Sequence, residues 1–455
     1  MKKSVIYFVL CVFVSFTLFS VSCKEDPKVE EQVVVPDPDP DPDPEPEPQP
    51  DPDPQPTLAQ TITIGAADYP VDSIHIEKIA TGIWYLYAQT RSAGEPQIIH
   101  SVRFTANTPG YAVETWISKD SVYAHETPSA MINRREAQGT TVRVAINGDF
   151  YNTNTLTATA ESGGAPSGCE IINGVMSYNL FAPEFTPEPL IGFDANNRPY
   201  MDHVTPRCKV KDADDNELPI TVVNSRRWAD YLVLYNSYAG KRTRTNQWGT
   251  EVLCVPLTAQ WEKLSNTRNV KCRVEKIREY EFDVTDLEIP KGRIVLSGNG
   301  TADAYLRNLS VGDDIWVTVD YELKSTPEIN TSVIKNAVSG LNIILHNNVI
   351  QEIPDHITNS GDRSVITSNH PRTSAGFSAD SAYVFFTVVE GRRTGIAAGV
   401  SCAELAQIMQ YLGAANAINL DGGGSSALVI DKVLKNYPTD GSQRAVANGL
   451  SLVVK

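Results

Sequence analysis

Between Pro36 and Pro56 every second residue is proline, and most of the residues between the prolines are aspartate or glutamate. Proline has no amide hydrogen to donate and fixes its own φ angle, so this stretch lacks half of the donors that a helix or sheet needs. It also has too little apolar surface to bury. We therefore expect residues 24–56 to form an extended, self-repelling tether of about 3.1 Å per residue. Folding is then confined to the residues that follow it.

The residues before the tether resemble an export signal. Lys2 and Lys3 precede an almost unbroken apolar run from Val5 to Phe19. A short basic start and a short apolar core are typical of a secretory signal peptide. A membrane-spanning helix needs roughly 20 apolar residues, so this run does not predict a transmembrane segment.

The signal ends in small residues followed by Cys23. This ending resembles a loose lipobox, so we interpret residues 1–23 as a lipoprotein signal peptide in which Cys23 receives the lipid. A plain signal with a chance cysteine is the alternative. The Lys24-Glu25-Asp26 sequence resembles the signal that sends some lipoproteins to the outer face of the outer membrane. We expect an exported protein with a lipid anchor in the outer membrane, facing outward.

Charge is unevenly distributed along the chain. The net charge is −16, and half of it lies in the first 56 residues, which hold four lysines and twelve acidic residues. The remaining body is only mildly acidic. Nucleic-acid binding is not expected, because a basic patch or stripe is its usual signature.

The body is rich in segments that predict β-strands. We expect an N-terminal β-rich region over residues 57–130 and a catalytic domain over residues 131–455, with an inserted β lobe at about 207–323. Further strands are predicted at 141–146, 231–235, 251–257, 270–281, 294–297 and 315–321. The fold class that follows is α+β, with β-rich mixed sheets and few helices.

The clearest local unit lies near the C-terminus. A strand is predicted from Tyr383 to Val389, and Ser401 and Glu404 then form a capping box. Apolar residues follow at helical spacing until Gly413, which suits a left-handed helix stop. A strand over 415–420, a polar loop and a strand over 427–430 complete the unit.

The polar loop carries the strongest chemical signal. Asp421 is followed by Gly422, Gly423 and Gly424, and then by Ser425 and Ser426. Glycines let a ligand approach the backbone closely, and the serines add hydroxyl donors. Without any comparison, a Gly-rich turn of purely structural purpose is equally consistent with this pattern.

Three other polar segments are candidates for the same site. Asn147-Gly148-Asp149 ends a predicted strand, although Asn-Gly alone is typical of a hairpin turn. Arg372 and Thr373 follow His370-Pro371, and a guanidinium there could hold a phosphate in a bidentate manner. Arg392 adds positive charge after Glu390-Gly391. For both arginines a solvated side chain is the alternative.

Five cysteines remain if Cys11 leaves with the signal and Cys23 is lipidated. Their spacing fits no zinc site, and Cys254 with Cys272 is a weak disulfide candidate; we favour buried free thiols. Serine-hydrolase and zinc-protease motifs are absent from the sequence. The five are Cys169, Cys208, Cys254, Cys272 and Cys402.

Taken in order, these motifs resemble the phosphodiester glycosidase domain family over roughly residues 140–455, and the segment around Asp421 is the most specific part. The resemblance implies hydrolysis of sugar-1-phosphodiester linkages on bacterial or host glycans at the cell surface. It implies catalytic roles for Asp149, Arg372 and Asp421. The implied substrate-binding residues are Asn147, Gly148, Thr373, Arg392, Gly422, Gly423, Gly424, Ser425 and Ser426. Glu390 stands where the family often has Asp.

On this interpretation Arg372 neutralises the phosphate, and Asp149 and Asp421 act on the sugar. Which Asp is the nucleophile or base stays open, as does retention or inversion at the anomeric carbon. We expect the three side chains to line one pocket, with the carboxylates about 5–10 Å apart. No cofactor is required, and a divalent metal held by the carboxylates stays an alternative. A non-catalytic glycan-binding lipoprotein is the second functional hypothesis.

Overall fold

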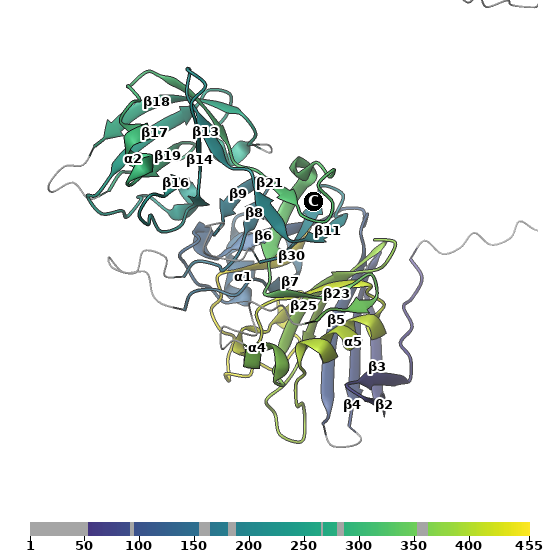
Figure 1. Cartoon of the computed structure of the whole chain (residues 1–455). Coiled ribbons are helices and arrows are strands. Elements are labelled where there is room, and N and C mark those ends of the chain that lie inside the picture. The colour runs from purple at the N-terminus through teal and green to yellow at the C-terminus, as the bar shows by residue number, and fades with distance from the viewer. Residues whose placement is uncertain are drawn as a thin grey trace, which may run out of the picture. The chain divides into compact units, whose positions relative to one another are not determined.

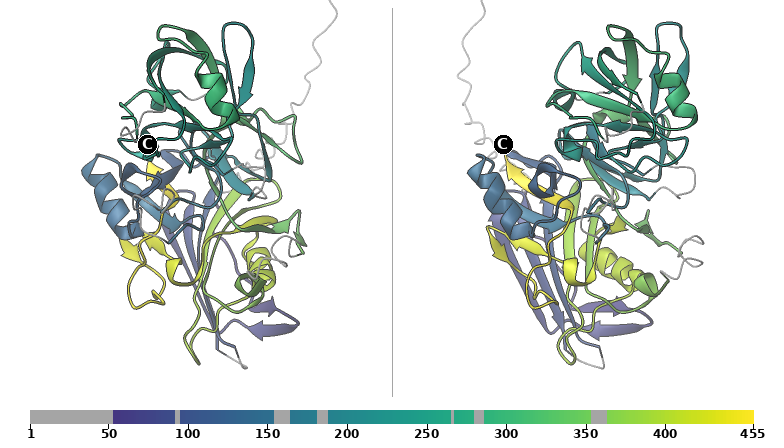
Figure 2. Two further views of the ribbon diagram at one scale, coloured as in Figure 1. Left: turned by 60° about the vertical axis from the view of Figure 1, so that its left-hand side comes forward. Right: turned by 90° about the vertical axis from the view of Figure 1, so that its left-hand side faces the viewer.

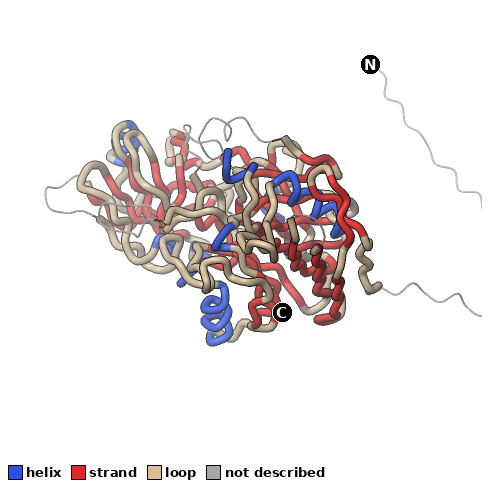
Figure 3. Tube along the Cα trace, turned by 90° about the horizontal axis from the view of Figure 1, so that it is seen from below, coloured by secondary structure: helices blue, strands red, loops and turns tan. Residues whose placement is uncertain are grey.

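Strands dominate the computed structural model, as the sequence pattern predicted. It describes residues 53–91, 95–153, 164–180, 188–264, 267–279, 286–352 and 363–455. In Figure 3 the described part of the body is mostly strand and loop, with few helices. The predicted α+β class of β-rich sheets with few helices is confirmed. Cys23 and the expected signal and tether up to residue 52 lie outside the described residues.

An eight-stranded antiparallel sheet, the helix-covered sheet, joins the two ends of the body in the order β24-β23-β27-β25-β26-β5-β4-β3. Its strands are β3 (Ser73–Ala80), β4 (Ile83–Thr90), β5 (Gln97–Thr105), β23 (Asn342–His346), β24 (Val349–Ile350), β25 (Arg372–Phe377), β26 (Tyr383–Val389) and β27 (Asn416–Asn419). Strands from the expected N-terminal β-rich region therefore share a sheet with C-terminal strands.

Helix α5 (Cys402–Leu412) lies along one face of this sheet, as both views in Figure 2 show. It packs on β23, β25 and β27 and on the hairpin that β1 (Thr61–Ile64) forms with β2 (Ala67–Pro70), and α4 (Arg363–Thr367) lies beside it. Its capping box is confirmed: the Ser401 hydroxyl accepts from the Glu404 amide, and the Glu404 carboxylate accepts from the Ser401 amide. Gly413 ends the helix with a φ of 102°.

A five-stranded sheet packs on the other face. Its order is β29-β28-β7-β30-β6, and its apolar side chains form one core with those of the helix-covered sheet, including Phe104, Phe386 and Ile146. The strands are β6 (Tyr111–Ile117), β7 (Val142–Asn147), β28 (Leu428–Ile430), β29 (Val433–Leu434) and β30 (Asn448–Val454), with helix α1 (Pro128–Ala137) against β7.

A third sheet carries the connection to the inserted lobe. It has five strands in the order β11-β10-β22-β8-β9. These are β8 (Glu170–Ile172), β9 (Val175–Tyr178), β10 (Leu190–Asp194), β11 (Pro199–Asp202) and β22 (Ile334–Ser339).

The inserted lobe is a separate eight-stranded sheet in the order β14-β13-β20-β18-β17-β19-β16-β15. The chain enters through β12 (Val204–Pro206) and leaves through β21 (Tyr321–Leu323), which pair with each other. The lobe strands and α2 gather together in Figure 1. They are β13 (Lys209–Lys211), β14 (Glu217–Pro219), β15 (Val222–Val223), β16 (Leu232–Tyr235), β17 (Thr250–Pro256), β18 (Val270–Arg278), β19 (Ile294–Gly298), β20 (Asp314–Thr318) and α2 (Thr301–Leu306).

Single 3-10 turns occur in several connections. They are η1 (Ser118–Asp120), η2 (Ser237–Ala239), η3 (Trp261–Lys263), η4 (Thr331–Val333) and η5 (Gly423–Ser425). Only η5 belongs to a predicted site segment.

The five body cysteines are buried free thiols. The preferred interpretation is confirmed, and the weak Cys254–Cys272 candidate is wrong. Because Cys254 pairs with Val274 and Cys272 with Pro256, the two cysteines are not opposite each other on β17 and β18. No helix in the described ranges is long and apolar enough to cross a membrane.

The end of the tether packs on the body, which corrects the expectation that residues up to Pro56 stay clear of it. The buried Asp53 carboxylate accepts from the Gly82 amide at 2.8 Å and from the Trp84 indole at 2.7 Å, and it pairs with Lys78. Pro56 is also buried. These buried donors need an acceptor, so the acid at position 53 is part of the fold.

Candidate active site

A pocket of about 200 Å³ forms at the carboxyl end of β27. Segments far apart in sequence supply its walls, including two that the sequence analysis singled out, around Arg372 and Asp421. The lining residues are Phe150, Val365, His370, Arg372, Arg392, Asp421, Gly422, Gly423, Gly424 and Arg444.

Asn147, at the end of β7, holds the Asp421 loop in place. Its amide nitrogen donates to the Asp421 carbonyl at 2.6 Å, and its Oδ1 accepts from the Thr373 hydroxyl and the Ala427 amide. The Gly148 carbonyl accepts from the Asp421 amide at 2.9 Å. Asn147 and Thr373 are fully buried, so the structure places both as supports for the loop.

The glycines of the loop allow close packing at the pocket wall. A Cβ on Gly424 would lie 2.1 Å from the Asp440 carboxylate and 2.3 Å from the Arg444 guanidinium. Gly423 has a φ of +61°, and a Cβ there would lie 3.2 Å from the Arg392 guanidinium. The loop backbone is therefore flanked by the guanidinium groups of Arg392 and Arg444.

Asp421 is the carboxylate of this pocket. Desolvation by burial raises its pKa to about 6, although a hydrogen bond with Ser425 and the charge of Arg444 act in the opposite direction. Near pH 7 the carboxylate is mostly ionised and remains basic enough to take up a proton. These are properties of a general base or a nucleophile.

Arg392 and Arg444 bring positive charge to the pocket, and His370 lies beside Arg392. The Arg392 guanidinium lies 3.1 Å from Nδ1 of His370, and burial, then the charges of Arg372 and Arg392, lower the pKa of His370. A guanidinium can only donate, so His370 is neutral with its proton on Nε2. Arg444 bonds with Asp440 at 2.7 Å.

Arg372 is placed differently from its predicted role. It lines the pocket, yet its side chain is 1% exposed. Its guanidinium donates to the backbone carbonyls of Val400 at 2.8 Å, Ser368 at 2.8 Å and Ile366 at 3.4 Å. These bonds tie together the segments that form one pocket wall.

Asp149 faces a buried acidic cluster beside β8 instead of lining the pocket. Its Oδ2 accepts from the Gly168 amide at 2.8 Å. Burial, then the neighbouring Glu188 carboxyl, raises the pKa of Asp149 well above its usual range. Two carboxylates in such a setting do not both ionise, so the Asp149–Glu188 pair holds a proton at neutral pH.

Glu170 is the third member of this cluster and is fully buried. Its carboxylate accepts from the Ser177 hydroxyl at 2.6 Å and from the Asn448 amide at 2.6 Å. Burial raises the pKa of Glu170 from its ordinary 4.5 to about 7. Asn448 also accepts from the Asp149 amide through its Oδ1, so the cluster fixes the chain just after Asn147.

Glu170→Gln should flatten the dependence of stability on pH. A raised carboxyl pKa means that the folded state prefers the protonated form, so this stability is present below about pH 4.5 and is lost as pH rises through about 7. Between pH 5 and 7.5 the wild type should lose up to about 3 kcal/mol more than the variant. Urea unfolding at the two pH values measures this, and equal losses would contradict it.

Ser425 and Ser426 are buried in the loop. Arg444 donates to Ser425 Oγ at 3.5 Å, whereas Ser426 Oγ has no hydrogen-bond partner among the described residues. The described residues also contain no group of three or more His, Cys, Asp or Glu side chains placed to hold a metal ion.

Sequence reasoning missed several residues of this region. His370 was visible in its motif but received no role. Arg444 and Asp440 lie in an ordinary polar stretch, and Glu188 stands between two prolines, which is typical of an exposed loop. Arg444 and Asp440 are opposite charges four residues apart that pair in the structure. That spacing is a local sequence signal that could have identified the pair.

Residues 272–453 match the model of the phosphodiester glycosidase family. The match includes Arg372, Arg392, Asp421 and Arg444 and confirms the predicted resemblance over that segment. Asp149 lies before it. A search of curated proteins found no match.

Solved structures with a similar fold include a protein from Burkholderia pseudomallei K96243 with a TM-score of 0.65 and 16% identity, covering 87% of this chain and 100% of that one. A protein from Synechocystis has a TM-score of 0.63 and 16% identity, covering 84% of this chain; the chain spans 64% of the length of that protein. The zebrafish N-acetylglucosamine-1-phosphodiester α-N-acetylglucosaminidase catalytic domain gives a TM-score of 0.41 and 12% identity, covering 83% of this chain and 87% of that one.

Proposed function

With residues 272–453 matching the phosphodiester glycosidase family, we propose that this protein hydrolyses the bond between the anomeric carbon of a sugar and a phosphodiester. One observation carries the proposal: the pocket brings the Asp421 carboxylate and the guanidinium groups of Arg392 and Arg444 together around a glycine loop. A sugar-1-phosphodiester needs both kinds of group. Its reacting carbon needs a carboxylate, and its leaving phosphate needs positive charge.

Arg392 and Arg444 take the role of binding the phosphate. Guanidinium groups bind phosphate oxygens through short, charge-assisted hydrogen bonds. The neutral His370 adds an Nε2 donor beside Arg392. A phosphate monoester is a weakly basic leaving group, so neutralising its charge helps its departure more than protonating it. Arg372 is a positioning residue that holds the wall through the carbonyls it binds.

Asp421 acts on the sugar as nucleophile or general base. Glycoside hydrolysis proceeds through an oxocarbenium-like transition state that a nearby carboxylate stabilises. With a pKa of about 6, Asp421 is ionised at neutral pH and can fill this role. Asp149, paired with Glu188, supports the site by holding the end of β7.

The test is a screen of methyl phosphodiesters of glucose-1-phosphate, N-acetylglucosamine-1-phosphate and mannose-1-phosphate for released reducing sugar. The wild type should release sugar from at least one of them. An Asp421→Asn sample prepared in parallel controls for contaminating hydrolases. Equal release by both proteins, or none by the wild type, would reject the proposal.

We also propose that the protein is exported and anchored through a lipid on Cys23, because a signal-like sequence precedes this residue and an acidic, proline-rich sequence follows it. Cys23→Ser should abolish incorporation of labelled fatty acid and move the protein from the membrane fraction to the soluble fraction. Membrane retention of the variant at the wild-type level would contradict the anchor.

A further inference from the structure

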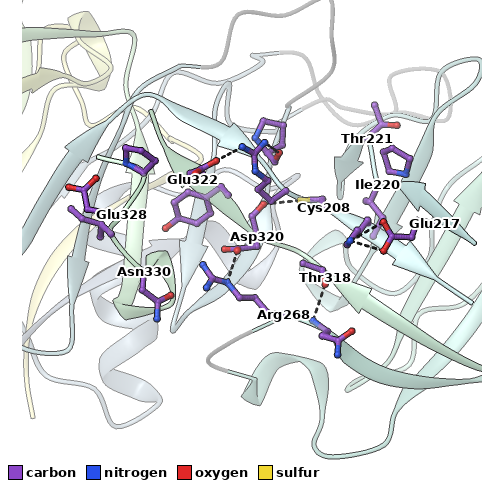
Figure 4. Close-up of a pocket in the computed structure, with 18 residues that line it drawn as sticks. Cys208, Glu217, Ile220, Thr221, Arg268, Thr318, Asp320, Glu322, Glu328 and Asn330 are labelled. Carbon is purple, nitrogen blue, oxygen red and sulfur yellow. Dashed lines mark hydrogen bonds and ion pairs between the residues drawn. The ribbon is translucent and has the colours of Figure 1, made fainter. Parts of the chain in front are cut away.

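A second and larger cleft, of about 900 Å³, lies where the inserted lobe joins the body. It shares no lining residue with the Asp421 pocket. Its walls come from the paired stem strands β12 and β21, the β13–β14 hairpin and the segments 268–269 and 327–330. Figure 4 shows the side chains of these segments around one space. The volume is typical of a site for a small molecule or a few linked sugars.

The charged side chains of this cleft are paired with one another. The pairs are Arg207 with Glu322, Lys209 with Glu217 at 2.7 Å, and Arg268 with Asp320 at 2.5 Å. Dashed lines in Figure 4 mark these contacts. Because each cation has its own carboxylate and Glu328 adds a further acid, the cleft offers no excess positive charge to an anionic ligand.

Apolar side chains lie between the ion pairs. Prolines and isoleucines provide apolar surface that can contact the C–H face of a sugar ring. They are Pro206, Pro219, Ile220, Pro327 and Ile329. A purely apolar ligand is disfavoured here, because it would remove water from three ion pairs without replacing their hydrogen bonds.

Tyr321 forms part of the cleft wall. It lines the cleft and is 6% exposed. Its hydroxyl is buried and has no hydrogen-bond partner among the described residues. Because protein atoms cover this hydroxyl, Tyr321 contributes to the cleft only the small part of its side chain that remains exposed.

From this combination we propose that the inserted lobe binds a neutral oligosaccharide in the cleft. Sugar hydroxyls suit the outward donors and acceptors of the ion pairs, and the sugar rings suit the apolar surface. The inference rests on the proposed function only in that the bound chain would be the uncharged part of the glycan whose phosphodiester is cut. Binding itself needs no catalysis.

The experiment uses isothermal titration calorimetry with maltohexaose, cellohexaose and a linear mannohexaose on the folded protein. The cleft variant is Arg207→Ala/Glu322→Ala, which removes a partly exposed pair and should leave the fold intact. Arg293→Ala/Glu275→Ala is the matched control, because it removes an exposed ion pair of the same lobe outside the cleft. Lys209→Ala/Glu217→Ala is a second cleft variant, which removes another exposed ion pair of the cleft wall.

At least one hexasaccharide should bind the wild type, the matched control and Asp421→Asn with equal affinity. Each of the two cleft variants should bind at least about tenfold more weakly, as expected for lost hydrogen bonds. Three outcomes overturn the proposal: no binding by the wild type, undiminished binding by both cleft variants, or loss of binding in Asp421→Asn. If no sugar-1-phosphodiester is hydrolysed in the screen, the proposed activity is rejected. Oligosaccharide binding measured by calorimetry would still support a site in the cleft.

Discussion

Asp421→Asn is expected to lower kcat on a sugar-1-phosphodiester by about 10²–10⁴-fold, the usual contribution of a general base. The amide keeps the size and shape of the side chain but can neither take up a proton nor attack carbon. The backbone contacts that fix the loop come from Asn147 and Gly148 to main-chain atoms of residue 421. The fold should therefore survive, and the melting temperature should stay close to that of the wild type.

Asp431→Asn is the matched control, because Asp431 is a half-exposed carboxylate nearby in sequence that pairs with Arg143. It should retain wild-type kcat. The wild-type profile of kcat/KM against pH should rise through about pH 6, where Asp421 ionises. Full activity of Asp421→Asn on a verified substrate, or a flat profile across that range, would exclude Asp421 as the catalytic carboxylate.

The arginines should separate into two classes when substituted. Arg392→Ala/Arg444→Ala removes both side chains assigned to the phosphate, and each charge-assisted hydrogen bond is worth about 1.5–3 kcal/mol. We expect kcat/KM for a phosphodiester to fall by about 10²–10⁴-fold, since about 1.4 kcal/mol corresponds to tenfold in rate. An aryl glycoside of the same sugar should be affected far less, because it presents no phosphate.

Arg372→Ala should instead destabilise the protein by several kcal/mol, because it removes a fully buried side chain together with its hydrogen bonds to three backbone carbonyls. The activity of this variant should be reduced by the same factor on the phosphodiester and on the aryl glycoside. Thermal unfolding and the two assays together distinguish the classes. A selective loss of phosphodiester activity in Arg372→Ala, with unchanged stability, would contradict this division. It would assign phosphate binding to Arg372, as the sequence analysis suggested.

Structural features that depend on residues close together in the chain were predicted well from the sequence. The capping box at Ser401, the helical spacing that follows it and the stop at Gly413 all act within a dozen residues, and α5 forms as expected. Strand β26 has the predicted bounds. Lobe strands β16 to β20 were also predicted to within a few residues, because apolar patterning is a property of the strand itself, whereas the short strands β13, β14 and β15 were not.

The expected meeting of Asp149, Arg372 and Asp421 in one pocket is seen only in part. Asp421 and Arg372 meet in one pocket, whereas Asp149, next along the chain from the supporting Asn147–Gly148 pair, faces Glu188 and Gly168. Along a strand, neighbouring side chains point to opposite sides, and the motif alone does not say which side of the strand end meets the pocket.

The sequence by itself determined the β-rich class, the helix on the C-terminal unit and the carboxylate–glycine loop, because each depends on residues close together in the chain. Tertiary structure alone decided which cation faces that loop. The Arg372 guanidinium donates to the backbone carbonyls of residues 366, 368 and 400. The Arg444 guanidinium instead lies beside Gly424 of the loop. A guanidinium binds whichever acceptors the folded chain places within hydrogen-bond distance, and those positions are set by packing between sheets far apart in sequence.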